Sequence, residues 1–68
     1  MVTTLTATRM GDFMEFFGDD AKRVADTLRL VVTRTRDGRQ ACGIPVWRFH
    51  NDSNRLRDAG FNGVESAS

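Results

Sequence analysis

The residues of this chain best suited to binding a ligand are three arginines, Arg34, Arg36 and Arg39, which lie around one Asp-Gly dipeptide. The segment Thr33–Arg39 has the sequence TRTRDGR, and its Asp-Gly pair is typical of a two-residue hairpin turn because both positions tolerate positive φ. In such a hairpin Arg36 faces Arg39, and Arg34 lies on the same face one pair further along. Like charges opposite one another destabilise a hairpin, and a phosphate bound between them would remove that penalty. The pattern favours an anion site, although arginines at a loop tip can also simply be solvated.

Cys42 and His50 are residue types that can act in catalysis or bind a metal, but the sequence argues against both roles here. Structural zinc needs about four clustered ligands, whereas the chain has one cysteine, Cys42, and one histidine, His50. A Cys–His nucleophilic pair would need an orienting third group and an oxyanion hole, for which no motif is present. The paired carboxylates are better suited to capping helices than to catalysis; they are Asp12 with Glu15 and Asp19 with Asp20. We therefore predict no enzyme activity, no metal and no cofactor.

Charge is distributed unevenly along the chain. The net charge is only +1, but residues 22–48 hold seven basic residues against two acidic ones. A positive segment of this kind is the footprint expected for a phosphate-bearing partner. The single cysteine permits no intrachain disulfide, which indicates a reducing compartment. No apolar run approaches the roughly 18 residues of a membrane span, so we expect a cytoplasmic protein without membrane contact.

An amphipathic helix is predicted immediately before the arginine segment. In Asp20–Val32 the apolar residues recur with the 3.6-residue period of one helix face, and charged residues occupy the other face. Asp19 or Asp20 would cap this helix, where a carboxylate also favours the positive end of the helix dipole. The cations on its polar face are Lys22, Arg23 and Arg29.

A first helix is predicted over Leu5–Phe17, where the apolar spacing is again helical. It could start at Thr6 or at Asp12. The longer version places Gly11 inside the helix at a cost of about 1 kcal/mol relative to alanine. Gly18 would end either version, because glycine adopts the left-handed conformation without strain.

A third helix is predicted after the return strand of the hairpin, which would extend to Phe49. It begins at Asp52 or Ser53 and ends at Ala59, followed by Gly60 and Phe61 in the positions of a Schellman motif, with Leu56 as the hydrophobic contact. Residues 1–61 would thus form a single domain. Residues 62–68 are small and polar and would form a flexible tail.

The helical interpretation also predicts which apolar residues are buried. Phe16 points away from the face shared by Phe13 and Phe17, so it would be left partly exposed together with Met10 and Met14. An exposed Phe/Met patch on so short a chain suggests a protein contact, either a homodimer or a different partner. The predicted core comprises Phe13, Phe17, Val24, Leu28, Val31, Trp47, Phe49, Leu56 and Phe61.

Taken together, residues 5–49 resemble a winged helix-turn-helix DNA-binding domain. Leu5–Val32 resembles the helix–turn–recognition-helix half, and the following basic hairpin resembles the wing. The resemblance implies an α+β fold in which the second helix enters the major groove and the wing lies along a phosphate backbone or in the minor groove. The residues that would then face double-stranded DNA are Lys22, Arg23, Arg29, Arg34, Arg36 and Arg39.

The function expected from this resemblance is non-catalytic. The chain would be a small DNA-binding regulator, either a transcriptional regulator or an excisionase-like architectural factor, of phage or plasmid type. An alternative is a phage- or plasmid-type inhibitor or adaptor that binds a host protein such as the transcription machinery. For that function the expected fold is a helix packed on a small antiparallel sheet, in which the N-terminal residues supply a third strand.

Overall fold

The computed structural model describes residues 3–67, and its first element is a β-hairpin. Strand β1 (Thr4–Met10) alternates threonine with Leu5 and Ala7, so that Leu5 and Ala7 both point to the buried face. Strand β2 (Phe13–Phe17) pairs with β1 in antiparallel register, with Met10 opposite Phe13. Gly11, at φ 63°, begins the two-residue turn between them, which requires the positive φ that glycine adopts freely. The predicted helix over residues 5–17 is therefore wrong.

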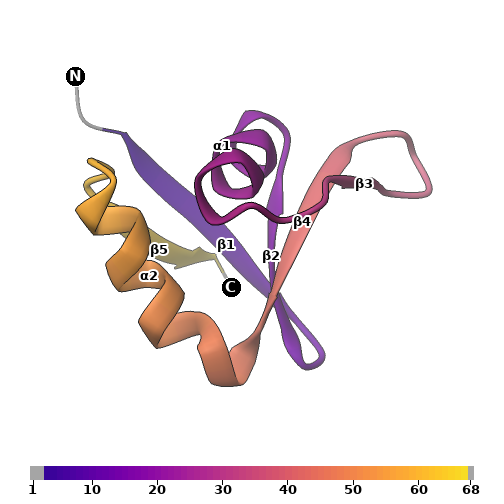
Figure 1. Ribbon diagram of the computed structural model, residues 1–68. Coiled ribbons are helices and arrows are strands. Elements are labelled where there is room, and N and C mark those ends of the chain that lie inside the picture. Colours follow the sequence, from indigo (N-terminus) through magenta and orange to yellow (C-terminus); the bar gives the residue numbers. More distant parts are fainter. Residues whose placement is uncertain (1–2, 68) are drawn as a thin grey trace.

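Five strands form one mixed sheet in the order β3-β4-β2-β1-β5 (Figure 1). Strand β4 (Gln40–Pro45) pairs antiparallel with β2 on one side and with the short β3 (Thr33–Arg34) on the other. Strand β5 (Gly63–Ala67) pairs parallel with β1. The sheet thus takes up most of the segment for which a flexible tail was predicted, since Thr4 to Thr8 pair with residues 63–67. Residue 68 lies outside the described residues.

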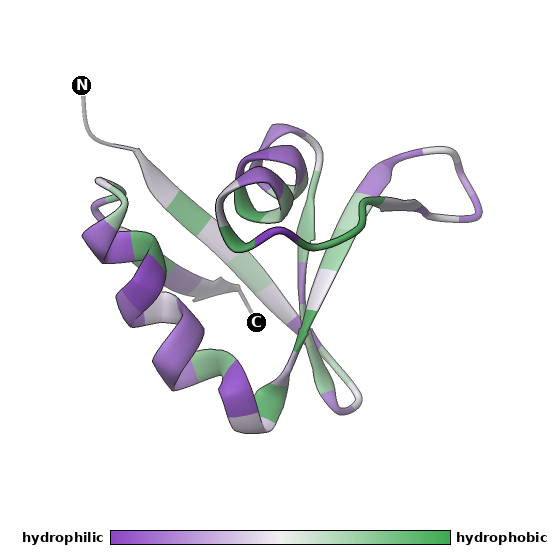
Figure 2. Cartoon of the chain, viewed as in Figure 1, coloured by the Kyte–Doolittle hydropathy of each residue, from purple (hydrophilic) through white to green (hydrophobic). Residues whose placement is uncertain are grey.

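Two ten-residue helices pack on the sheet. Helix α1 (Asp19–Leu28) contacts β2 and β4, and helix α2 (Phe49–Asp58) contacts β5 and α1. A 3₁₀ turn, η1 (Val46–Arg48), joins β4 to α2 where a continuation of the return strand was predicted. Figure 2 shows that α2 is mainly hydrophilic and that green residues are concentrated in the strands and in the sheet-facing turns of α1.

The α+β class predicted from the sequence is confirmed, but the winged helix-turn-helix arrangement is wrong. That arrangement needs two consecutive helices before the hairpin, and the first of them is the β1–β2 hairpin. Helix α1 is present, although it ends four residues before Val32. The ending of α2 is confirmed as a Schellman motif: the N–H of Phe61 donates to the carbonyl of Leu56 at 3.2 Å, and that of Gly60 to Arg57 at 3.0 Å. The division into a domain over residues 1–61 stays a prediction.

Asp20 links α1 to the first strand instead of capping the helix. Its carboxylate accepts a hydrogen bond from the backbone N–H of Thr6 at 3.1 Å and another from Arg23, also at 3.1 Å. No side-chain cap bond is present at the start of α1, which begins after Gly18 at φ 63°. The first-turn carboxylates still complement the positive end of the helix dipole.

The core lies between the helices and one face of the sheet. Because side chains alternate along a strand, burying Met14 and Phe16 directs Phe13, Glu15 and Phe17 to the opposite face. The predicted core residues Val24, Leu28 and Leu56 are confirmed, whereas Phe13, Val31 and Trp47 are exposed. The main buried apolar residues are Leu5, Ala7, Met14, Phe16, Ala21, Val24, Ala25, Leu28, Cys42, Ile44 and Leu56.

Neither α-helix of residues 3–67 is long and apolar enough to cross a membrane.

Candidate nucleic-acid interface

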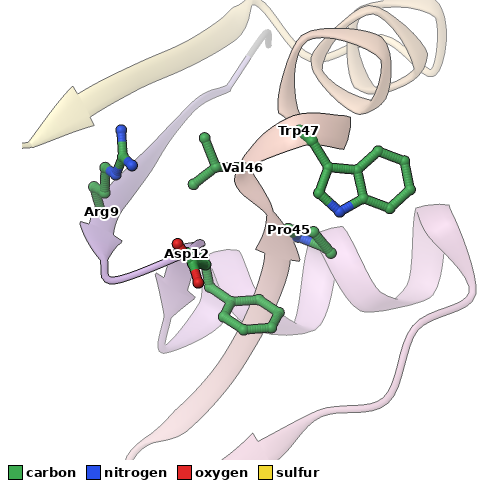
Figure 3. Close-up of a pocket in the computed structure, with 6 residues that line it drawn as sticks. Arg9, Asp12, Pro45, Val46 and Trp47 are labelled. Carbon is green, nitrogen blue, oxygen red and sulfur yellow. The ribbon is translucent and has the colours of Figure 1, made fainter.

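One end of the sheet carries a pocket of about 480 Å³ between the β1–β2 turn and η1. The backbone N–H of Val46 donates to the carbonyl of Asp12 at 2.8 Å, which joins the end of β4 to the turn. Figure 3 shows Arg9 and Asp12 on the hairpin side and Trp47 projecting from the start of η1 beyond Pro45. The pocket is lined by Arg9, Asp12, Phe13, Pro45, Val46 and Trp47.

Two large aromatic side chains in this lining are exposed to solvent. Phe13 is 46% exposed and Trp47 is 83% exposed, in a chain whose other phenylalanines are buried or half-buried. Phe13 lies opposite Pro45 in the β2–β4 ladder, and Trp47 follows two residues later, so the fold brings both to the same end of the sheet. Exposed aromatic residues beside a concave surface are typical of a binding site.

The charged groups at this end are mostly engaged within the chain. The Nε of Arg9 donates to the carbonyl of Gly11 at 3.1 Å, which supports the turn. The guanidinium of Arg48 lies over the Trp47 ring, 6.0 Å from its centroid. The pocket is therefore walled mainly by apolar and aromatic surface, with Arg9 and Asp12 as the charged residues of its lining.

Glu15 lies two residues beyond Phe13 on the same face of β2. It is half-buried and stands opposite Gly43 of β4. On the other face of the sheet lies Cys42, whose pKa is raised first by burial of the thiol and then by the negative charge of Glu15. Phe13 and Glu15 thus place one aromatic and one acidic residue on the same face of β2, two residues apart.

The arginine segment lies at the opposite end of β2 and β4 from this pocket (Figure 1). Its loop is longer than predicted: Arg34 pairs with Gln40, so residues 35–39 form the connection. The N–H of Thr35 donates to the carbonyl of Arg39 at 2.8 Å, and that of Gly38 donates back to Thr35 at 3.0 Å. The predicted pairing of Arg36 with Arg39 across a two-residue turn is therefore wrong.

Two of the three loop arginines contact other groups of the chain. Arg34 donates to the carbonyl of Gly38 at 2.8 Å, and the guanidinium of Arg39 lies 4.6 Å from the centre of the Phe17 ring. The Thr35 hydroxyl hydrogen-bonds to the Asp37 carboxylate and, with the nearby Arg39, lowers the pKa of Asp37. Arg36 is exposed. The loop is thus a structured and positively charged protrusion.

The cations predicted for the second helix lie away from the exposed aromatic residues. Lys22 and Arg23 are exposed on α1, which packs against the face of the sheet opposite Phe13. Arg23 pairs with Asp20 at 3.1 Å. Arg29 follows the helix in the left-handed conformation, at φ 59° and ψ 47°. The structure therefore does not combine helix, loop and pocket into one continuous surface.

The protein-contact patch predicted from Met10, Met14 and Phe16 is not present. Met14 and Phe16 are 5% and 0% exposed, because β2 alternates where a helix was predicted, and Met10 alone is exposed. Cys42 is buried on β4 and His50 is exposed on α2. Among residues 3–67, no group of three His, Cys, Asp or Glu side chains is arranged to hold a metal.

Phe13, Glu15 and Trp47 were not predicted from the sequence as candidate site residues. The signal that could have found the first two is the hairpin itself: a Gly-Asp turn preceded by alternating threonines places both on one strand face. Trp47 carried no such local signal, since its exposure depends on the 3₁₀ turn after Pro45.

These features define a small α+β domain with a mixed sheet and with exposed aromatic residues at one end of it. The family model described as MutS domain I matches residues 1–63. The chain belongs to the MutS domain I family.

Relatives agree with this assignment. The chain is 45% identical over 53 residues to the DNA mismatch repair protein MutS of Petrotoga mobilis, a match that covers 78% of this chain and 6% of that protein. It is 43% identical over 53 residues to the MutS of Fervidobacterium nodosum, with 78% and 6% covered. It is 39% identical over 57 residues to that of Leptospira interrogans, with 84% and 7% covered. The chain therefore corresponds to less than a tenth of the length of these relatives.

Membership of this family corrects the functional prediction. A winged-helix regulator of phage or plasmid type, and the alternative inhibitor of a host protein, are both contradicted by the match to MutS domain I over residues 1–63 and by the mismatch-repair relatives. The sequence pattern suggested the wrong family because an amphipathic helix followed by a basic hairpin occurs both in winged-helix domains and in this chain.

Proposed function

We propose that this domain contacts DNA for a mismatch-repair protein, with Phe13 and Trp47 as its base-contacting residues. The observation that carries the proposal is the exposure of both aromatic side chains around one pocket. The relatives supply the context, since each is a DNA mismatch repair protein. The chain's own part in this function is recognition without catalysis.

Insertion of an aromatic side chain at a base step explains how such a surface would favour mismatched DNA. Proteins that place Phe or another apolar wedge between bases must unstack them, which requires a few kcal/mol. That energy is lowest where the base pair is mismatched. A fixed aromatic ring would therefore insert more easily at a mispair and bind mispaired DNA more tightly than fully paired DNA. It would not need contacts specific to each base.

Glu15 would add a polar contact beside the inserted ring. A carboxylate repels phosphate but accepts hydrogen bonds from donor groups on base edges. Its position two residues from Phe13 on the same strand face suits contact with a displaced base.

The basic residues predicted from the sequence are proposed as phosphate contacts at a distance from the pocket. Arg34, Arg36 and Arg39 lie four or more strand residues from Phe13, or about 13 Å along β2. They would thus contact the backbone several base pairs away. Lys22, Arg23 and Arg29 would contribute a weaker attraction, because Arg23 is already paired with Asp20.

The test is fluorescence-anisotropy binding of the chain to two duplexes that differ only by one mispair, at about 50 mM salt, where phosphate contacts contribute more to affinity than at higher salt. Phe13→Ala and Trp47→Ala should each weaken binding by roughly 5- to 150-fold, the range for loss of one base–aromatic stack. Phe13→Ala should also abolish the preference for the mispair. Val31→Ala is the matched control, because Val31 is an exposed apolar residue outside the pocket.

A salt series separates the arginine loop from the aromatic end. The triple variant Arg34→Ala/Arg36→Ala/Arg39→Ala should bind with a salt slope shallower by about 0.9 for each lost phosphate contact. Arg57→Ala, on α2, measures the effect of removing one positive charge outside the loop, one third of the charge removed in the triple variant. Absence of binding to either duplex, or equal losses in Phe13→Ala and Val31→Ala, would contradict the proposed function.

A further inference from the structure

Asp52 is a charged residue with no exposed surface. It lies in the first turn of α2, and its two carboxylate oxygens face two different arginines. Oδ2 is 3.2 Å from Nη2 of Arg48, and Oδ1 is 3.4 Å from Nη1 of Arg55. A buried carboxylate needs such counter-charges. Because burial fixes Asp52, its carboxylate is a fixed counter-charge for both guanidinium groups: Oδ1 accepts a hydrogen bond from Arg55, and Oδ2 forms an ion pair with Arg48 without hydrogen-bond geometry.

The two arginines differ in what else they contact. The guanidinium of Arg48 lies over the Trp47 ring at 6.0 Å from its centroid, within the range of a cation–π contact. Among the described residues, Arg55 makes no such aromatic contact. Arg48 therefore connects the buried carboxylate to the exposed indole, whereas Arg55 shares the carboxylate alone.

We infer that Asp52 is a positioning residue for Trp47: it holds Arg48 against the indole and so presents Trp47 as a fixed wall of the pocket. This inference rests on the proposed function for its link to DNA. An indole that is 83% exposed has few packing contacts to restrict its rotation. A guanidinium held from behind by a buried carboxylate restricts it without covering it. Restricting a side chain before binding reduces the entropy lost on contact with a ligand.

The same geometry means that the charge of Arg48 is not free to bind a phosphate group. Its charge is paired with Asp52 within the chain. Its contribution to binding is therefore orientation of an aromatic ring, in contrast to the exposed Arg36.

Time-resolved fluorescence anisotropy of Trp47 in the free chain tests the inference, because Trp47 is the only tryptophan. Arg48→Gln and Asp52→Asn should each increase the amplitude of the nanosecond local depolarisation about twofold, as the indole gains rotamer freedom. Arg55→Gln is the matched control: it removes the other partner of Asp52 and should leave the depolarisation as in the unsubstituted chain. Circular dichroism establishes that each variant is folded.

The comparison of Arg48→Gln with Arg55→Gln decides the matter even if Asp52→Asn does not fold. Equal depolarisation in the two arginine variants, whether unchanged or increased in both, would overturn the inference. A mispaired duplex then tests the functional link: Arg48→Gln should bind about threefold more weakly than Arg55→Gln. Increased indole motion with unchanged DNA affinity would contradict the DNA role of Trp47 and leave its positioning by Asp52 supported.

Discussion

Glu15 and Gly43 lie directly opposite one another on β2 and β4, and the glycine leaves the space that the carboxylate occupies. A Cβ built on Gly43 would come within 3.0 Å of Cδ of Glu15 and closer still to Oε2. Real Cβ atoms do not approach other atoms so closely. Gly43 therefore allows the Glu15 side chain to lie across the sheet, over β4.

Gly43→Ala should displace Glu15 with little loss of stability. The obstructing atoms are the end of a flexible side chain, so we expect the free energy of unfolding to fall by less than about 1 kcal/mol. The displaced carboxylate should lower the pKa of Cys42, because Glu15 is one cause of its raised value. Urea unfolding and a titration of thiolate absorbance measure the two effects. If Glu15→Gln lowers this pKa and Gly43→Ala does not, the side chain does not depend on the glycine.

Cys42 should make the stability of the fold depend on alkaline pH. Burial, reinforced by Glu15, raises the pKa of the thiol above its ordinary value of 9.0. The folded state then holds the proton more tightly than the unfolded state, so the stabilisation is complete below pH 9.0 and is lost as pH rises toward the folded pKa.

Urea unfolding measured from pH 7 to pH 11 checks this prediction with Cys42→Ala as the comparison. The variant should unfold with a flatter pH dependence above pH 9.0, the ordinary value for the thiol. The chain has no tyrosine and one lysine, the exposed Lys22, so few other groups titrate in this range. An unchanged alkaline slope in Cys42→Ala would contradict the assignment to the thiol.

Phe16→Ala and Phe13→Ala should differ sharply in stability although they lie three residues apart. Phe16 is completely buried, and truncating such a residue removes about 3–5 kcal/mol. Phe13 is 46% exposed, so its truncation should remove no more than about 1 kcal/mol. Chemical denaturation of both variants measures the difference. The reverse order is what the helical interpretation of residues 5–17 would require.

Arg29→Gly should stabilise the chain. Arg29 holds the left-handed conformation after α1, which costs an L-residue about 1–2 kcal/mol, and glycine's greater unfolded-state freedom offsets only part of the relief. We expect a net gain of roughly 0.5 kcal/mol in thermal or urea unfolding. Lys22→Gly, within the helix, should instead destabilise by about 1 kcal/mol. Similar losses in both variants would show that the Arg29 side chain stabilises the fold.

The features that the sequence predicted correctly are those encoded by neighbouring residues. The amphipathic stripe from Ala21 to Leu28 predicted α1, because helix hydrogen bonds close within four residues. The Leu56–Gly60–Phe61 pattern predicted the Schellman ending of α2 for the same reason. The basic character of the loop around Asp37 was also predicted correctly, because it depends only on neighbouring residues.

The features that were mispredicted depend on residues far apart in the chain. Phe13–Phe17 is apolar at nearly every position and fits a helix or a strand, and its pairing with β4 selects the strand. The last strand is small and polar, and only parallel pairing with β1 reveals it as part of the sheet. The sequence by itself thus determined the apolar face of α1 and the Schellman ending of α2. The tertiary structure decided which phenylalanine is buried, which aromatic residues are exposed and where Asp52 is anchored, because each of these depends on non-local contacts that no short pattern records.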